Sequence, residues 1–179
     1  MAYLCSKALY GVFSFHIVEV VSLINKIKIS FQETFKTEPL MIFSPGRINI
    51  IGEHTDYNNG FVLPTAIDKK IRFSFKKNGT KTNCSAYSKN FDSSFSFNLE
   101  NVKPSSQQWE NYILGVIFEI QQLSNKLEGF DCFLDSNIPV GSGISSSAAL
   151  ECGLVFGLNE LFNLGFSKLT LVEIGQRAE

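Results

Sequence analysis

Residues 45–64 read Pro-Gly-Arg-Ile-Asn-Ile-Ile-Gly-Glu-His-Thr-Asp-Tyr-Asn-Asn-Gly-Phe-Val-Leu-Pro. This stretch places four chemically active side chains among glycines and apolar residues: Arg47, Glu53, His54 and Asp56. An ordinary turn would need only the glycine and asparagine residues, and buried charges are costly unless they are paired. The pattern therefore indicates a ligand-binding segment.

The residues on either side of this stretch have the patterns of short strands. Leu40–Phe43 is apolar and precedes Ser44-Pro45-Gly46, which predicts a strand that ends at a turn. Residues 48–51 predict a second extended piece. We therefore expect the charged residues to lie at strand ends and in the loop between strands.

Further strands are predicted along the middle of the chain. Residues 71–76 and 81–87 flank Asn78-Gly79, a strong signal for a β-hairpin. Residues 93–99 and 130–134 alternate polar and apolar side chains, as half-buried strands do.

Two segments have helical periodicity. Residues 107–123 follow the breaker Pro104, with Ser105 or Ser106 able to cap the helix. Residues 145–163 carry a stripe of leucines, begin with serines and precede Gly165, which predicts the C-terminal stop. Because helices and strands do not alternate regularly, the predicted fold class is α+β.

The second helix follows a loop rich in glycine and serine. Residues 139–149 read Pro-Val-Gly-Ser-Gly-Ile-Ser-Ser-Ser-Ala-Ala. Gly141 and Gly143 let backbone amides approach a ligand, and the first turn of a helix offers unpaired amides to a phosphate. A glycine turn followed by an ordinary serine N-cap is the alternative. No lysine follows the glycines, so this is not a Walker loop.

Three segments together resemble a known family. The stretch at 45–64 resembles the galactokinase signature of the GHMP kinases, a superfamily that also includes homoserine, mevalonate and phosphomevalonate kinases. The loop at 139–149 is similar to the second motif of that superfamily. Between them, Trp109-Glu110-Asn111-Tyr112-x-x-Gly115 is similar to a galactokinase helix.

The resemblance covers the chain from about Phe31 onward. It implies a GHMP-type N-terminal domain over residues 31–179, similar to domain 2 of ribosomal protein S5, with a mixed sheet packed against helices. Residues 1–30 would be an N-terminal extension of uncertain role.

The resemblance also implies how a sugar would be held. Glu53, His54, Thr55 and Asp56 would bind the hydroxyls of galactose. A site of this kind is selective because a wrong sugar leaves buried polar groups unpaired. Arg47 would stabilise negative charge on the transferring phosphate, and an ion pair with Glu53 or Asp68 is a further possible role.

An ATP site is implied in the same way. Trp109 would border the nucleotide base, although its position on a helix face suits a core residue equally well. The hydroxyl of Ser147 and the carboxylate of Glu179 would bind Mg²⁺, which prefers oxygen ligands and few protein groups. The full set of expected nucleotide contacts is Ser88, Trp109, Gly141, Ser142, Gly143, Ile144, Ser145, Ser146 and Ser147.

The activity that the resemblance implies is cytoplasmic, ATP-dependent phosphorylation of the anomeric hydroxyl of α-D-galactose. The family's catalytic aspartate and second domain lie beyond the position of Glu179, so we expect an N-terminal half that does not turn over alone. N-acetylgalactosamine kinase and a non-catalytic sensor of galactose and ATP are the alternatives. The intact run 54–60 favours galactose, and Arg47 and Ser147 favour catalysis.

Composition agrees with a globular protein that binds a small molecule. The chain is 44% hydrophobic with a net charge of −1, so it lacks the basic excess that nucleic-acid binding normally requires. Residues 8–24 are largely apolar but contain His16 and Glu19, which argues against a membrane span. We favour an N-terminal extension that leads into an amphipathic helix at 20–35 over a targeting segment.

The cysteines lack the spacing of a metal site. We expect them to be reduced and mostly buried: Cys5, Cys84, Cys132 and Cys152.

Overall fold

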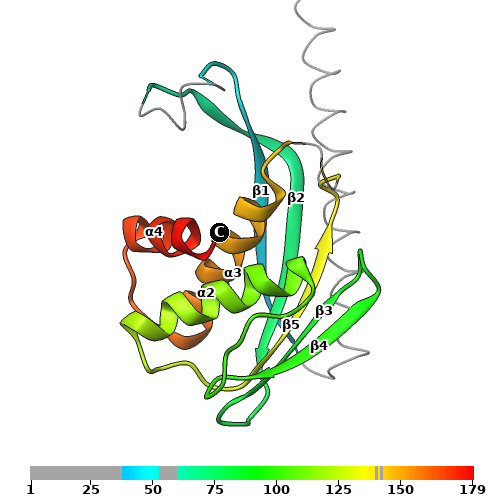
Figure 1. Cartoon of the computed structure of the whole chain (residues 1–179), viewed down its shortest axis with the longest axis vertical. Coiled ribbons are helices and arrows are strands. Elements are labelled where there is room, and N and C mark those ends of the chain that lie inside the picture. The colour runs from blue at the N-terminus through cyan, green and yellow to red at the C-terminus, as the bar shows by residue number, and fades with distance from the viewer. Residues whose placement is uncertain (1–37, 53–59, 140, 142) are drawn as a thin grey trace, which may run out of the picture. The chain divides into compact units, whose positions relative to one another are not determined.

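The computed structural model of the protein describes residues 38–52, 60–139, 141 and 143–179. The chain divides into two compact units, Met1–Pro39 and Leu40–Glu179, and the described strands and helices belong to the second. The helix predicted at residues 20–35 lies outside the described residues. In Leu40–Glu179 the described strands form one sheet, and helices α2, α3 and α4 gather on one side of it (Figure 1).

The sheet is mixed, as predicted, with the strand order β1-β2-β5-β3-β4. Neighbouring strands are antiparallel except for β3 and β5, which are parallel. The strands are β1 (Leu40–Asn49), β2 (Pro64–Lys77), β3 (Asn83–Ser88), β4 (Ser93–Asn98) and β5 (Phe130–Ser136). The α+β prediction is therefore confirmed, as are the strands predicted at 93–99 and 130–134.

The turn predicted at Ser44-Pro45-Gly46 is wrong. The chain stays extended through these residues, and β1 is one continuous strand. Its register against β2 shifts between Pro45 and Arg47. Proline has no N–H for the ladder, so it is accommodated by an irregularity within the strand.

The hairpin predicted around Asn78-Gly79 is also wrong in its pairing. The chain does turn there, with Gly79 at φ +80°, but β2 and β3 do not pair with each other. Strand β5 lies between them and bonds to both. The Asn78 side chain instead ties the turn to β5, through a 3.2 Å hydrogen bond to Asp131.

Helix α3 (Ser146–Phe162) lies directly on the sheet. A Cβ atom on Gly153 would collide with the ring of Phe73, and one on Gly157 would collide with the ring of Phe75. Both phenylalanines are fully buried and stack with ring centroids 5.6 Å apart. The two glycines therefore let the helix backbone approach the rings, which centres the hydrophobic core between α3 and β2.

The helices predicted at 107–123 and 145–163 are confirmed, but the predicted serine cap of the first is wrong. Helix α2 (Gln108–Leu123) has Gln107 at its N-cap, and neither serine caps it. Ser105 is instead held by the side chain of Asn111, which bonds to both its backbone N–H and its carbonyl at 2.7 and 3.0 Å. Helix α3 ends at Phe162 with Asn163 as its left-handed C-cap, and the predicted stop Gly165 follows at φ 78°.

Helix α4 (Lys168–Ala178) was not predicted from the sequence. Ser167 caps it by accepting a hydrogen bond from the Thr170 N–H at 3.1 Å. Its Leu171 and Ile174 side chains are buried.

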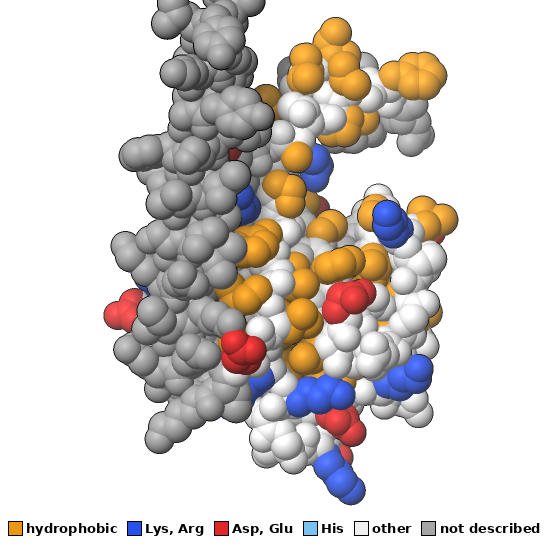
Figure 2. Space-filling model, turned by 180° about the vertical axis from the view of Figure 1, so that it is seen from behind, with side chains coloured by type: hydrophobic (Ala, Val, Ile, Leu, Met, Phe, Trp, Pro, Cys, Tyr) orange, Lys and Arg blue, Asp and Glu red, His pale blue; other side chains and the backbone are white. Residues whose placement is uncertain are grey.

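Hydrophobic side chains are exposed where the β1–β2 ribbon extends past the helices, and Figure 2 shows them gathered at that end. Two backbone hydrogen bonds, between Ile50 and Leu63 and between Leu63 and Ile51, continue the ribbon beyond the strands. The exposed residues are Ile48, Ile50, Ile51, Phe61, Val62 and Leu63. None of the helices in the described part of the chain is long and apolar enough to cross a membrane.

Candidate functional site

Strand β1 and the glycine and serine loop meet directly at Gly46 and Arg47. The Arg47 backbone N–H donates a 3.2 Å hydrogen bond to the Ile144 carbonyl. A Cβ atom on Gly46 would lie 2.9 Å from the same oxygen, so a larger residue would push the loop away. Two motifs almost a hundred residues apart are thereby held side by side, with the Arg47 side chain exposed beside the loop.

The start of α3 has no side-chain cap. Ser145 occupies the N-cap position at φ 59°, ψ 51°, and its hydroxyl makes no capping hydrogen bond. This finding argues against the alternative of an ordinary serine N-cap. The first-turn amides have no partner within the helix, and the helix dipole adds partial positive charge, so this end can bind an anion. Gly141 and Gly143, at φ 72° and 71°, shape the approach to it.

A cavity of about 830 Å³ opens in front of this helix start. Its wall brings together five of the nucleotide-binding residues predicted from the sequence: Ser88, Trp109, Gly141, Ser146 and Ser147. A cavity of this size is in the range of small-molecule and cofactor sites.

Trp109 is both a core residue and part of the cavity wall. Its side chain is buried and makes an edge contact with Phe95 at 5.2 Å between centroids. The half-exposed Phe91 ring stacks on it at 5.8 Å and also lines the cavity. The two interpretations of Trp109 drawn from the sequence are therefore compatible.

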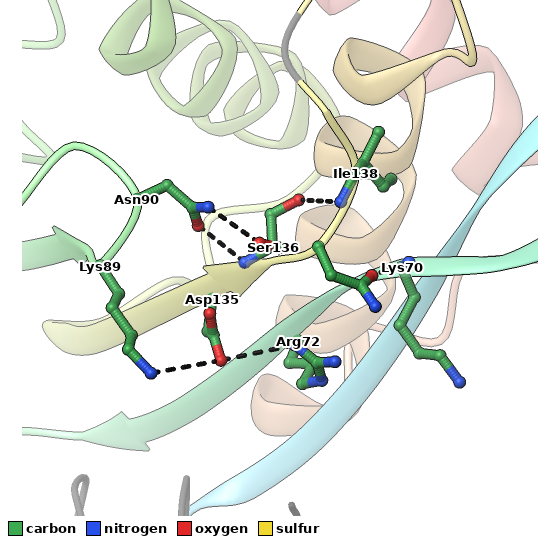
Figure 3. A network of polar contacts seen from close by, with 8 residues as sticks. Lys70, Arg72, Lys89, Asn90, Asp135, Ser136 and Ile138 are labelled. Carbon is green, nitrogen blue, oxygen red and sulfur yellow. Dashed lines mark hydrogen bonds and ion pairs between the residues drawn. The ribbon is translucent and has the colours of Figure 1, made fainter. Parts of the chain in front are cut away.

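A polar network fixes the cavity edge formed by the ends of β3 and β5 (Figure 3). The Asn90 side chain donates to the Ser136 carbonyl at 2.8 Å and accepts from the Ser136 N–H at 2.7 Å. Below it, Asp135 contacts Arg72 at 3.4 Å and Lys89 at 3.7 Å. These contacts hold the segment that leads from β5 into the loop at 139–149.

The carboxyl end of α4 reaches the start of α3, where the Ser147 hydroxyl donates a 2.7 Å hydrogen bond to the Glu179 carboxylate. Arg177 anchors α4 to α2 through a 2.7 Å ion pair with Glu119. Gly115 of α2 makes room for this arrangement, since a Cβ atom there would lie 2.7 Å from the Ala178 carbonyl oxygen. The helix motif predicted at 109–115 therefore ends at Gly115, whose lack of a side chain lets the end of α4 pack against α2.

Glu151 is a buried carboxylate next to the start of α3 that the sequence prediction did not single out. It lies one helical turn after Ser147, is 1% exposed, and its Oε1 has no hydrogen-bond partner among the described residues. Burial and the nearby charge of Glu179 raise its pKa to about 7. The available signal was a lone carboxylate on the otherwise apolar face of the helix predicted at 145–163.

Several predicted site residues lie outside the described part of the chain: Glu53, His54, Thr55, Asp56 and Ser142. Of the two ion pairs suggested for Arg47, the one with Asp68 is not among the ion pairs of the described residues; the Asp68 carboxylate lies 3.9 Å from the Lys69 ammonium instead. The described ranges contain no group of three or more His, Cys, Asp or Glu residues arranged to hold a metal ion.

The cysteine prediction holds in part. Cys84 and Cys132 are free and buried, and burial raises the pKa of both thiols, that of Cys84 to about 11. Cys152 is free but exposed, and Cys5 lies outside the described residues.

Comparison with known proteins gives consistent matches in sequence and structure. Residues 29–77 match the galactokinase galactose-binding signature, and residues 111–179 match the N-terminal domain of GHMP kinases. A galactokinase from Thermosipho africanus is 42% identical over 144 residues, which are 78% of this chain and 38% of that protein.

Among solved structures, Lactococcus lactis galactokinase complexed with galactose superimposes with a TM-score of 0.81 at 36% identity. The match covers 87% of this chain and 42% of that one. A mevalonate kinase at 21% identity shares the fold, with a TM-score of 0.69. This chain therefore spans about two fifths of the length of its curated relatives.

Proposed function

We propose that this chain, which belongs to the galactokinase family of GHMP kinases, supplies the galactose-binding and phosphate-binding parts of an enzyme that phosphorylates the anomeric hydroxyl of α-D-galactose with ATP. The observation that carries this proposal is the junction of Arg47 with the Ile144 carbonyl. It joins the start of the stretch at 45–64 to the loop that leads into the uncapped start of α3.

The nucleotide is proposed to occupy the 830 Å³ cavity. Its base would lie against the Phe91 and Trp109 rings, which offer an aromatic face at the cavity wall. Its phosphates would meet the first-turn amides of α3 and the hydroxyls of Ser145, Ser146 and Ser147. Phosphoryl transfer depends mainly on positioning and electrostatics, and this arrangement provides both.

The Mg²⁺ that accompanies ATP in this proposal would be held by Ser147 and Glu179. Their oxygen atoms lie 2.7 Å apart, so both can face one cation, and Mg²⁺ commonly keeps its remaining positions for water and phosphate. When bound, the ion neutralises charge on the phosphate oxygens. Arg47, exposed at the end of the signature strand, would stabilise the charge that develops on the transferring group.

Galactose selectivity is proposed to come from Glu53, His54, Thr55 and Asp56, within the segment that matches the galactose-binding signature. The Lactococcus lactis relative was solved as a complex with galactose, which supports this choice of sugar. A cytoplasmic location would suit the free thiols of Cys84 and Cys132.

Binding and turnover test different parts of the proposal. Saturation-transfer NMR on the 179-residue chain should detect galactose in preference to N-acetylgalactosamine and glucose. Any longer natural protein that carries this sequence should form galactose 1-phosphate, and Arg47→Ala should lower its kcat by roughly 10²- to 10³-fold. A longer protein that bound galactose and ATP but formed no sugar phosphate would favour a sensor, and faster turnover of N-acetylgalactosamine would reassign the substrate.

A further inference from the structure

The buried carboxylate of Glu151 has no role in the function proposed above. A buried carboxyl oxygen without a hydrogen-bond partner is costly, and such groups are rare in folded proteins. Oε1 of Glu151 is in this state among the described residues, in a side chain that is 1% exposed. The free-energy cost of burying an unpaired Glu151 oxygen beside a candidate binding site points to a bound group that donates a hydrogen bond to it.

Helix geometry directs Glu151 toward the Ser147–Glu179 pair. Residues four apart lie on the same face of a helix, so Ser147 and Glu151 share the face of α3 that meets α4. A Cβ atom on Gly175 of α4 would lie 3.8 Å from the Glu151 Cβ, which shows how closely the two helices pack there. One turn further along α4, Glu179 accepts the hydrogen bond from Ser147.

A hydrated cation would satisfy this carboxylate. Mg²⁺ dehydrates reluctantly and keeps several waters, whose hydrogen atoms must find acceptors inside a protein site. Groups beyond the direct ligands orient those ligands, and their loss typically weakens metal binding by 10- to 100-fold. Glu151 carries an acceptor of this kind one helical turn from Ser147, since its Oε1 has no hydrogen-bond partner among the described residues.

We propose that Glu151 is a positioning residue whose Oε1 accepts a hydrogen bond from a water molecule on the divalent cation held between Ser147 and Glu179. This inference rests on the proposed function for the cation itself. It adds a third oxygen group, one that touches the cation only through water.

The test exploits two effects of opposite sign. Glu151→Gln keeps the shape of the side chain but removes its charge, so without divalent cations the variant should unfold at the same or a higher temperature than the wild type. The same variant should bind Mn²⁺ roughly tenfold more weakly in the presence of ATP, measured by the EPR signal of free Mn²⁺. Loss of affinity in a protein that is no less stable cannot come from misfolding.

Glu173→Gln is the matched control, because Glu173 is an exposed carboxylate on α4. It removes the same charge and should leave Mn²⁺ affinity within twofold of the wild type. The relaxation rate of water protons gives a second measure, since loss of an acceptor for bound water should change the enhancement per Mn²⁺ in Glu151→Gln but not in Glu173→Gln.

The outcomes separate the two proposals. Wild-type affinity and relaxation in Glu151→Gln would overturn the role of Glu151 and leave the cation site intact. Equal weakening in both variants would also overturn it, because the effect would be one of net charge. If the wild-type chain with ATP bound no Mn²⁺, or if Ser147→Ala left its affinity unchanged, the proposed cation site and this inference would both fail.

Discussion

Gly115 in the middle of α2 lies against the last carbonyl of α4: a Cβ atom on Gly115 would stand 2.7 Å from the Ala178 carbonyl oxygen. The next residue is Glu179, whose carboxylate accepts the hydrogen bond from Ser147. Gly115 in α2 therefore determines how closely the end of α4 packs, and with it where the Glu179 carboxylate lies. The close contact with Ala178 explains in structural terms why the Trp109–Gly115 motif ends in glycine.

Gly115→Ala should therefore destabilise the protein. Inside a helix this substitution normally stabilises by about 1 kcal/mol, because alanine has the higher helix propensity. Here the added methyl group collides with a backbone carbonyl, and overpacking of this kind costs about 1–3 kcal/mol. Urea unfolding should show a net loss of stability, and the stabilising effect of Mn²⁺ with ATP should shrink because Glu179 is displaced.

The control for Gly115 is Gln122→Ala, an exposed position on the same helix. It should change stability by less than about 0.5 kcal/mol. A Gly115→Ala variant more stable than the wild type would contradict the close contact between α2 and α4.

Gly157→Ala should destabilise the core, and a smaller side chain at position 75 should offset part of that loss. The added methyl group would collide with the ring of Phe75, which is fully buried against α3. We expect a loss of about 1–3 kcal/mol from overpacking. Phe75→Leu alone should lose a few kcal/mol by opening a cavity.

The double variant Gly157→Ala, Phe75→Leu should be more stable than the sum of the single effects predicts, since the methyl group fills part of the space that the ring leaves. Chemical denaturation of all four proteins gives this coupling energy. Strict additivity would mean that the helix shifts away from the sheet instead of packing on the new surface.

Glu151 should make stability depend on pH. In the presence of a chelator, its pKa in the folded protein is raised from 4.5 to about 7 by burial and by Glu179. The folded state therefore holds a proton that the unfolded state has released between these values. The stability that this group contributes is fully present below pH 4.5 and is lost as the pH rises through 7.

Replacing Glu151 with glutamine removes that dependence. The stability of Glu151→Gln relative to the wild type should increase from about pH 5 to pH 8, by up to the order of 3 kcal/mol, because each pKa unit is worth about 1.4 kcal/mol. Thermal unfolding across this range measures the difference. A constant difference at every pH would mean that Glu151 is solvated in the folded state.

Local patterns in the sequence were sufficient for most of the individual elements. The alternation at 130–134 and the helical spacing at 107–123 each describe how one segment buries its own face, so they predict strand β5 and helix α2. The choice of which strands pair with each other could not be predicted from local patterns in the same way. Asn78-Gly79 makes a turn locally, but β5, about fifty residues further on, competes for the edges of both β2 and β3 and lies between them.

The residues of the candidate site show the same distinction between local sequence patterns and contacts between distant segments. Trp109 and Ser147 sit within recognisable motifs and line one cavity in the structure. The signal for Glu151 in the sequence is weak, because its importance depends on α4 packing against α3. In a helix pattern alone it is one polar residue among leucines, and only burial without a hydrogen-bond partner makes it stand out.

Replacing Ser145 with glycine should stabilise the protein, whereas replacing it with alanine should not. Its backbone is left-handed at φ 59°, a conformation that costs an L-residue about 1–2 kcal/mol, and its hydroxyl makes no cap to offset that cost. Glycine removes the Cβ clash, whereas alanine keeps it and loses only the hydroxyl. Urea unfolding should therefore rank Ser145→Gly about 1 kcal/mol above Ser145→Ala. If alanine were equal to glycine, the left-handed turn before α3 would not be a feature of the protein in solution, and the uncapped helix start that the ATP proposal uses would lose its support.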